Sequence, residues 1–139
     1  EDKLEDLFKP SYTTPGRATS TVNRIKRNPK IGERIKELYE NKCQVCNVLL
    51  KTPTGAISIG AHIKGLGRPH NGPDVIENML CLCPNHHDQF DNYSFYIDSS
   101  SYKIVGLDNY EGKTITLSKK HHIGKEFLDY HHSEFLKNN

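Results

Sequence analysis

Two pairs of metal-ligand residues, far apart in the sequence, constrain the fold of this chain more than any other feature. Cys43 and Cys46 form a C-x2-C pair, and Cys83 and His86 form a C-x2-H pair. This spacing lets both side chains of a pair reach one ion, and two such pairs complete the tetrahedral shell of zinc. One ion would then join two distant segments of a 139-residue chain, which has room for a single modest core. We therefore predict a structural zinc site at these four residues.

Two other residues compete for places in this zinc site. Cys81 lies two positions before Cys83 on the same face of a predicted strand, and His131 lies on the apolar face of a predicted helix. We favour a core role for both, since cysteine is among the residue types most often buried and an apolar helix face points inward. The spacing of the zinc ligands also argues against two disulfides, and therefore for a reducing compartment, the cytoplasm.

The positive charge of the chain is concentrated in one block. The net charge is +2, but residues 17–68 hold eleven Lys and Arg against three Glu, a local charge of +8 (11 − 3). Such a block is typical of proteins that bind nucleic acid, and also of solvated faces and linkers. The apolar runs fall well short of the roughly 18 residues that cross a bilayer, and the N-terminus lacks a signal pattern. We expect a soluble protein without a membrane partner.

Hydrophobic periodicity and turn residues predict an α+β fold. Asn28-Pro29 is a helix-start signal, and apolar residues follow it at helical spacing. The first half of the domain is predicted to contain a helix at 29–41, a strand at 57–62, a Gly- and Pro-rich loop at 65–74, an antiparallel strand at 78–82 and a short helix at 84–92. The second half is predicted to contain a hairpin of 94–97 with 102–105, a strand at 114–117 and a closing helix at 125–137. Residues 1–28 are expected to form a basic linker or arm, and residues 29–139 the domain.

Polar side chains on the predicted strands and helix can together hydrolyse a phosphodiester bond. His62 can take a proton from water near neutral pH, which suits a general base. His87 and Asp91 lie at i and i+4 on one helix face and can bind a divalent ion. The Asn78 amide is neither acid nor base, so we expect it to orient His62 through a hydrogen bond or to complete the metal shell. Two loop residues can contact flanking phosphates, Lys64 and Arg68.

These residues resemble the HNH family of endonucleases, whose fold is the ββα-metal motif, also called the His-Me finger. The family's string is a His-Ile pair, a Gly-rich loop, Asn-Leu and a Leu-Cys-x-x-Cys/His-His segment. It is matched here by His62-Ile63, Gly65 to Gly72, Asn78-Met79 and residues 82–87. The resemblance covers about residues 43–92. It implies that His62, Asn78 and His87 are the catalytic residues, that Mg²⁺ or another divalent ion such as Mn²⁺ is the catalytic cofactor, and that zinc is structural.

A closer resemblance, over residues 66–75 and 81–91, is to the HNH domain of SRA (YDG)-fused modification-dependent restriction endonucleases. In that group the SRA domain recognises modified cytosine and the HNH domain cuts. The resemblance implies that this chain is the cleavage half and follows an N-terminal recognition domain. One position departs from the family, because many HNH proteins place a metal-binding Asp or His where this chain has Ala61. His70 or Asp74 can compensate, although a loop carboxylate such as Asp74 more often caps backbone amides.

We thus expect a small zinc-stapled ββα-metal (HNH) domain with flanking helices and an additional β-hairpin. It would cut double-stranded DNA as the cleavage module of a modification-dependent restriction enzyme, and cutting both strands with one site per chain would favour a homodimer. Two other hypotheses stay open on the sequence. One is a non-catalytic zinc-stabilised DNA-binding module, which Ala61 favours, and the other is a nuclease that acts on RNA or as a toxin.

Overall fold

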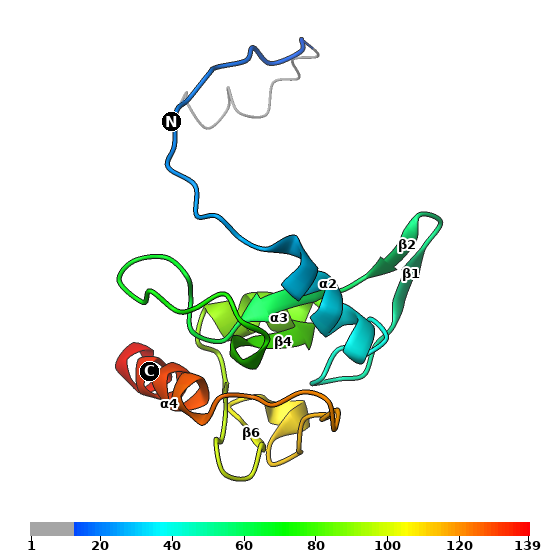
Figure 1. The fold of residues 1–139 in the computed structure, drawn as a ribbon, viewed down its shortest axis with the longest axis vertical. Helices are drawn as coiled ribbons and strands as arrows, with labels where there is room; N and C mark the ends of the chain where they lie inside the picture. The colour runs from blue at the N-terminus through cyan, green and yellow to red at the C-terminus, as the bar shows by residue number, and fades with distance from the viewer. Residues whose placement is uncertain (1–12) are drawn as a thin grey trace, which may run out of the picture.

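The computed structural model describes residues 13–139, so the first part of the predicted arm, residues 1–12, lies outside the described residues. The described chain has three α-helices and three two-stranded antiparallel sheets (Figure 1). The elements are α2 (Pro29–Leu38), β1 (Leu50–Thr52), β2 (Gly55–Ile57), β3 (Ile59–His62), β4 (Met79–Leu82), α3 (Pro84–Asp91), β5 (Tyr96–Ile97), β6 (Ile104–Val105) and α4 (Lys125–Asn138), with short 3-10 turns η1 (Ile76–Asn78) and η2 (Asp108–Tyr110). This mixed architecture confirms the predicted fold class.

The centre of the domain is the unit of β3, a long loop, β4 and α3. β3 and β4 are antiparallel, with Ile59 opposite Leu82 and His62 opposite Met79. All four residues of β4 are buried, and they alternate between two cores because successive side chains of a strand point to opposite faces. Met79 and Cys81 pack against α2, whereas Leu80 and Leu82 belong to the larger core with residues of α3, β5, β6 and α4. A buried strand between two cores gives the site a rigid base.

Helix α2 begins at the predicted position but ends early. The side chain of Asn28 accepts a hydrogen bond from the Lys30 backbone N–H at 3.1 Å, and Pro29 occupies the first helical position. The helix was predicted to reach residue 41 but ends at Leu38, since Glu40 and Asn41 have φ of 53° and 61°. Such left-handed backbone cannot continue a right-handed helix, and it turns the chain toward Cys43.

Two differences from the predicted elements lie in the outer parts of the domain. The hairpin of β1 and β2 was not predicted, and Figure 1 shows it projecting from the body. All three residues of β2 are exposed, so this strand lacks the apolar alternation that identifies a half-buried strand. The strand predicted at 114–117 was wrong, because Thr114 forms only an isolated bridge with Lys103. The predicted β5–β6 hairpin and the closing helix are confirmed.

The described part of the arm is exposed along residues 13–28 and extends away from the domain in Figure 1. Its last residues are attached to the loop between β3 and β4. The Asn28 backbone N–H donates to Asp74 Oδ2 at 2.7 Å, and the Ile25 side chain lies against Gly67. Within residues 13–139, no helix has the length and apolar character needed to span a membrane.

Candidate active site and metal centre

The predicted zinc ligands lie together in the structure. Cys43 and Cys46 come from the turns after α2, whereas Cys83 and His86 come from the start of α3. Their ligand atoms all lie within 4.8 Å of one another, and among the described residues this is the one group of three or more such ligands that could share an ion. The structure therefore places a Cys3His cluster where the two half-sites were predicted to meet.

The geometry and chemistry of the cluster fit zinc. The Sγ atoms of Cys46 and Cys83 are 3.9 Å apart, and His86 Nδ1 is 3.3 Å from Cys83 Sγ and 3.7 Å from Cys43 Sγ. Tetrahedral bonds of about 2.3 Å to sulfur and about 2.1 Å to nitrogen require S–S and S–N separations of about 3.8 and 3.6 Å. Burial raises the pKa of the Cys46 thiol to about 12, so a bound cation is what would hold it as thiolate. Burial also lowers the pKa of His86, which keeps the imidazole neutral and able to bind a metal.

The two competing residues lie elsewhere. Cys81 is fully buried in the core under α2, and its backbone N–H donates to Gln44 Oε1 at 2.8 Å. His131 is buried against Phe90, with ring centroids 3.7 Å apart and planes nearly parallel, and its Nε2 donates to the Phe90 carbonyl at 2.9 Å. Burial lowers the pKa of His131 to about 4. Both side chains therefore belong to the core.

His62, at the end of β3, is held by Asp74. Its Nε2 lies 2.8 Å from Asp74 Oδ1, and the same carboxylate accepts the Asn28 N–H with its other oxygen. The hydrogen bond from the Asn28 N–H lowers the pKa of the Asp74 carboxyl below its usual value, and the His62 ring lowers it by a smaller amount. Asp74 is therefore an anion. With Nε2 donating to a carboxylate, Nδ1 is the ring nitrogen that can take a proton.

Asn78 stabilises the loop rather than His62. Its Oδ1 accepts the Lys64 backbone N–H at 2.8 Å, and its Nδ2 donates to the carbonyls of Lys64 and Pro73, both at 2.9 Å. Asn78 is also fully buried, which leaves it unable to complete a metal shell at the surface. The expected hydrogen bond to His62 is thus replaced by three bonds that close the loop on either side of it. The physical reason is that a buried amide can satisfy all three of these backbone groups, one as acceptor and two as donor.

His87 and Asp91 share one face of α3 and lie within hydrogen-bonding distance of each other. His87 Nε2 lies 3.0 Å from Asp91 Oδ2, and these side chains are 31% and 50% exposed. Two adjacent ligands of an octahedral ion with bonds of about 2.1 Å are also about 3.0 Å apart. Burial raises the pKa of the Asp91 carboxyl, and the neighbouring His87 opposes this shift. The pair therefore suits a hard divalent cation that solvent and substrate can reach.

Within the described residues no third His, Cys, Asp or Glu joins this pair as a ligand. Ala61 is buried in β3. The two side chains considered as compensating ligands have other partners, because Asp74 binds His62 and His70 Nδ1 lies 2.5 Å from Tyr130 Oη. The remaining positions of a bound ion would fall to water and to phosphate oxygens, which Mg²⁺ accepts.

His62, His87 and Asp91 line one pocket of about 350 Å³, together with Arg27, Tyr93 and residues of β3 and the following loop. A larger hollow of about 890 Å³ lies beside the zinc cluster and is lined by Cys46, Cys83 and His86. We assign the chemistry to the smaller pocket, because it holds the candidate base and the candidate ion ligands. The larger hollow contains neither.

Comparisons with known proteins identify the type of domain. The model of a family described as HNH endonuclease matches residues 43–98. The chain contains an HNH endonuclease domain. A solved structure titled "Modification dependent TagI restriction endonuclease" matches the chain with 38% identity and a TM-score of 0.73, over 78% of this chain and 38% of that one. No curated protein matches. The HNH domain is therefore a nuclease domain, and the chain spans well under half the length of the TagI chain.

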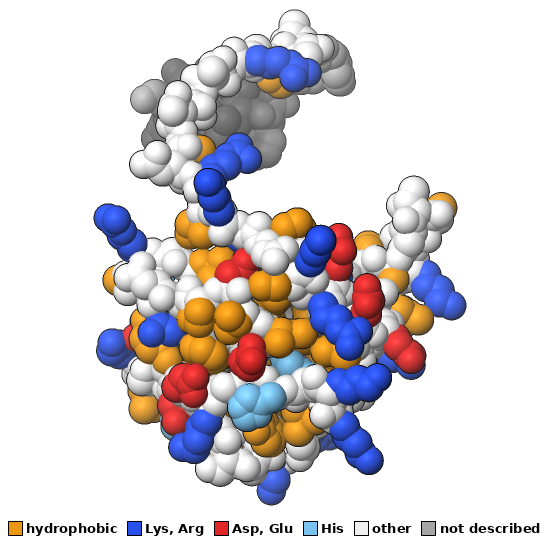
Figure 2. Space-filling view, in the orientation of Figure 1, with side chains coloured by type: hydrophobic (Ala, Val, Ile, Leu, Met, Phe, Trp, Pro, Cys, Tyr) orange, Lys and Arg blue, Asp and Glu red, His pale blue; other side chains and the backbone are white. Residues whose placement is uncertain are grey.

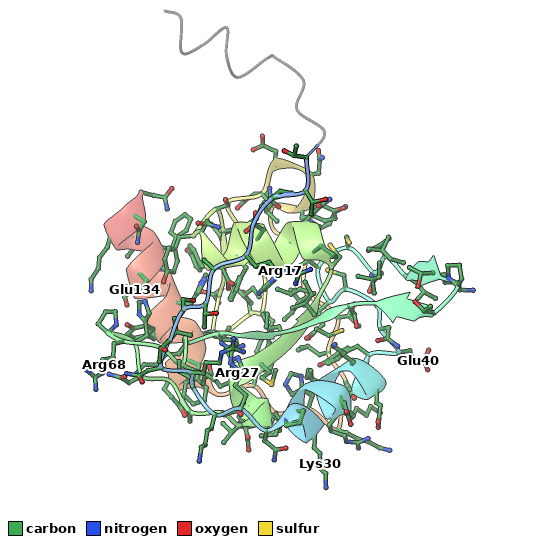
Figure 3. All side chains as sticks on the ribbon, turned by 90° about the horizontal axis from the view of Figure 1, so that it is seen from above. Arg17, Arg27, Lys30, Glu40, Arg68 and Glu134 are labelled. Carbon is green, nitrogen blue, oxygen red and sulfur yellow. The ribbon has the colours of Figure 1, made fainter. Side chains whose placement is uncertain are left out.

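The two predicted phosphate contacts occupy different positions in the HNH domain. The Lys64 ammonium lies over the Tyr130 ring of α4, 4.5 Å from its centroid. Arg68 is exposed at the outer edge of the loop in Figure 3. Neither residue lines the pocket of His62, His87 and Asp91, whereas Arg27, which the sequence placed only in the general basic block, does. On the face of the molecule drawn in Figure 2, the Lys and Arg side chains are scattered over the body and the arm rather than gathered in one patch.

Proposed function

We propose that this HNH domain hydrolyses phosphodiester bonds of double-stranded DNA, with His62 as the general base. The observation that carries the proposal is that His62, His87 and Asp91 line one pocket while a carboxylate holds the far side of the His62 ring. A base, a pair of ion ligands and an open cavity are the parts that phosphodiester hydrolysis needs.

In the proposed reaction His62 Nδ1 takes a proton from the attacking water. Asp74 orients the ring through Nε2 and balances the positive charge of the imidazolium that forms. A divalent ion such as Mg²⁺ or Mn²⁺, held by His87 and Asp91, would stabilise the charge on the phosphate and on the departing oxygen. Asn78 acts at a distance from the reacting atoms, by closing the loop after His62. The Cys3His cluster is proposed to bind structural Zn²⁺ and to hold the first turn of α3.

The TagI match supports a more specific context. We propose that the domain is the cleavage module of a modification-dependent restriction enzyme, and that residues 1–28 join it to an SRA-like recognition domain. The match supports this because it relates the chain at 38% identity to part of a longer enzyme with that activity in its title. Cytoplasmic location and a homodimer that cuts both strands stay predictions.

A plasmid-nicking assay in Mg²⁺ or Mn²⁺ tests the activity. His62→Ala should lose about 10²–10⁴-fold in rate while its zinc content stays unchanged. His122→Ala, which removes an exposed histidine outside the pocket, should cut like wild type. Wild type that binds duplex DNA but does not cut with any divalent ion would instead support the non-catalytic DNA-binding module, the hypothesis that Ala61 favours. Cleavage of RNA in preference to duplex DNA would contradict the proposed substrate.

A further inference from the structure

We propose that Arg27, at the base of the N-terminal arm, binds the scissile phosphate inside the catalytic pocket. The inference rests on the proposed function and adds a catalytic residue from outside the β3–β4–α3 unit. Among the described residues, Arg27 is the one Arg or Lys that lines this pocket. It shares the cavity with His62, His87 and Asp91, so a phosphate placed between the base and the ion ligands lies beside the guanidinium.

The position of Arg27 is held by contacts on both sides. The next residue, Asn28, donates its backbone N–H to Asp74 at 2.7 Å and caps α2 with its side chain. Two residues earlier, Ile25 lies against Gly67 of the loop between β3 and β4. Figure 3 shows the Arg27 side chain over the interior of the domain, whereas Arg68 lies at its edge. These contacts keep the base of an otherwise exposed arm at the mouth of the pocket.

The chemistry of arginine suits this position. A guanidinium stays charged and offers a planar fork of N–H donors that matches two phosphate oxygens. Among residues 13–139, the one carboxylate that lines the pocket is Asp91, which lies beside His87. The charge of Arg27 also helps to keep the pKa of the nearby Asp74 carboxyl low. Among the described residues that line the pocket, no carboxylate is left without a partner to compete with a phosphate for the guanidinium. Donors aimed at developing negative charge stabilise the transition state more than the ground state.

Asp74 also connects this residue to the general base. One of its oxygens binds His62 and the other binds the N–H that follows Arg27. The spacing between the base and the guanidinium therefore depends on one carboxylate. This arrangement predicts that Arg27 acts on the rate of cleavage and not merely on DNA affinity.

Arg27→Ala tests the proposal, with Arg24→Ala as a matched control on the same arm, since Arg24 is exposed and does not line the pocket. The measurements are the single-turnover cleavage rate of a short duplex at saturating enzyme with Mg²⁺, and the Kd for the same duplex with Ca²⁺. Arg27→Ala should lower the rate by about 10²–10³-fold with a change in Kd of about tenfold or less, whereas Arg24→Ala should keep the rate within about twofold. Arg27→Lys should fall between wild type and Arg27→Ala, since it keeps the charge and loses the fork.

An Arg27→Ala rate equal to that of Arg24→Ala, with His62→Ala inactive, would overturn the inference and leave the proposed function intact. Failure of the wild type to cut DNA with any divalent ion would overturn both the inference and the proposed function. Zinc content and the melting temperature are measured for every variant. If Arg27→Ala lowers either one, Arg27→Gln replaces it in the same comparison, and a wild-type rate for Arg27→Gln overturns the inference.

Discussion

The two oxygens of Asp74 hold two parts of the molecule that are far apart in the sequence. Oδ1 lies 2.8 Å from His62 Nε2, and Oδ2 accepts the Asn28 backbone N–H at 2.7 Å. The candidate base and the end of the arm are therefore fixed to the same side chain. Loss of either contact would leave a partly buried polar group without its partner, so the arrangement is sensitive to single substitutions.

Asp74→Asn should lower kcat by roughly 10²–10⁴-fold with little change in KM, because an amide can present the wrong partner to Nε2 and cannot balance the imidazolium. Asn28→Ala is the control, since it removes the side-chain cap of α2 but keeps the backbone N–H that Asp74 accepts. Steady-state cleavage of a labelled duplex separates kcat from KM. Wild-type kcat in Asp74→Asn would contradict the orienting role of Asp74, and an equal loss in Asn28→Ala would show that the loss does not require a change at the carboxylate.

Cys43→Ser should lower the zinc stoichiometry and destabilise the domain by several kcal/mol, a fall in Tm of roughly 10 °C or more, because metal binding is coupled to folding. Cys81→Ala removes a buried thiol that is not in the cluster, and it should retain zinc. His62→Ala should melt close to wild type. Zinc analysis with thermal melts checks all three. Retained zinc in Cys43→Ser would exclude that residue as a ligand.

Asp91→Asn should raise the Mg²⁺ concentration that gives half-maximal activity by roughly tenfold or more, since an amide oxygen binds a hard cation less tightly than a carboxylate. Asp88→Asn is a matched control, because Asp88 is exposed on α3 and does not line the catalytic pocket. Metal titrations of the nicking rate distinguish the two. The same Mg²⁺ requirement in both variants would argue against Asp91 as an ion ligand.

The domain should lose stability as the pH falls, in part through His131. Burial lowers the pKa of His131 from 6.5 to about 4. Between these values the unfolded chain binds a proton that the folded chain does not, so stability is fully present above pH 6.5 and falls as the pH drops toward 4. The full effect is about 3 kcal/mol.

Urea unfolding at several pH values checks this dependence. His131→Gln should flatten the dependence of the free energy of unfolding on pH between about 4 and 6.5, whereas His122→Gln, an exposed control, should not. The comparison with wild type is needed because other groups, such as the Asp74 carboxyl with its lowered pKa, also make the fold less stable in acid. An unchanged slope in His131→Gln would show that burial does not keep His131 neutral.

Much of the central unit was predictable because its signals are short-range. The two ligand pairs have the spacing that one tetrahedral ion requires, and α3 begins where Pro84 follows Cys83. The apolar alternation before His62 placed that residue at the end of β3, opposite β4. His87 and Asp91 share a helix face because four residues make about one turn. In each case a local period determines which side chains lie together.

The partners of the candidate catalytic side chains depended on tertiary structure. His62 and Asp74 are twelve positions apart across a loop with no regular period, so no pattern predicted their hydrogen bond or the three that Asn78 makes instead. Arg27 lines the pocket beside a residue that Asp74 binds, Asn28, and this contact joins segments 46 positions apart. The sequence by itself predicted the spacing of the Cys3His cluster and of the His87 and Asp91 pair. Only the tertiary structure of the β3–β4 loop decided which side chain orients His62, because loop contacts depend on packing between distant segments rather than on periodicity.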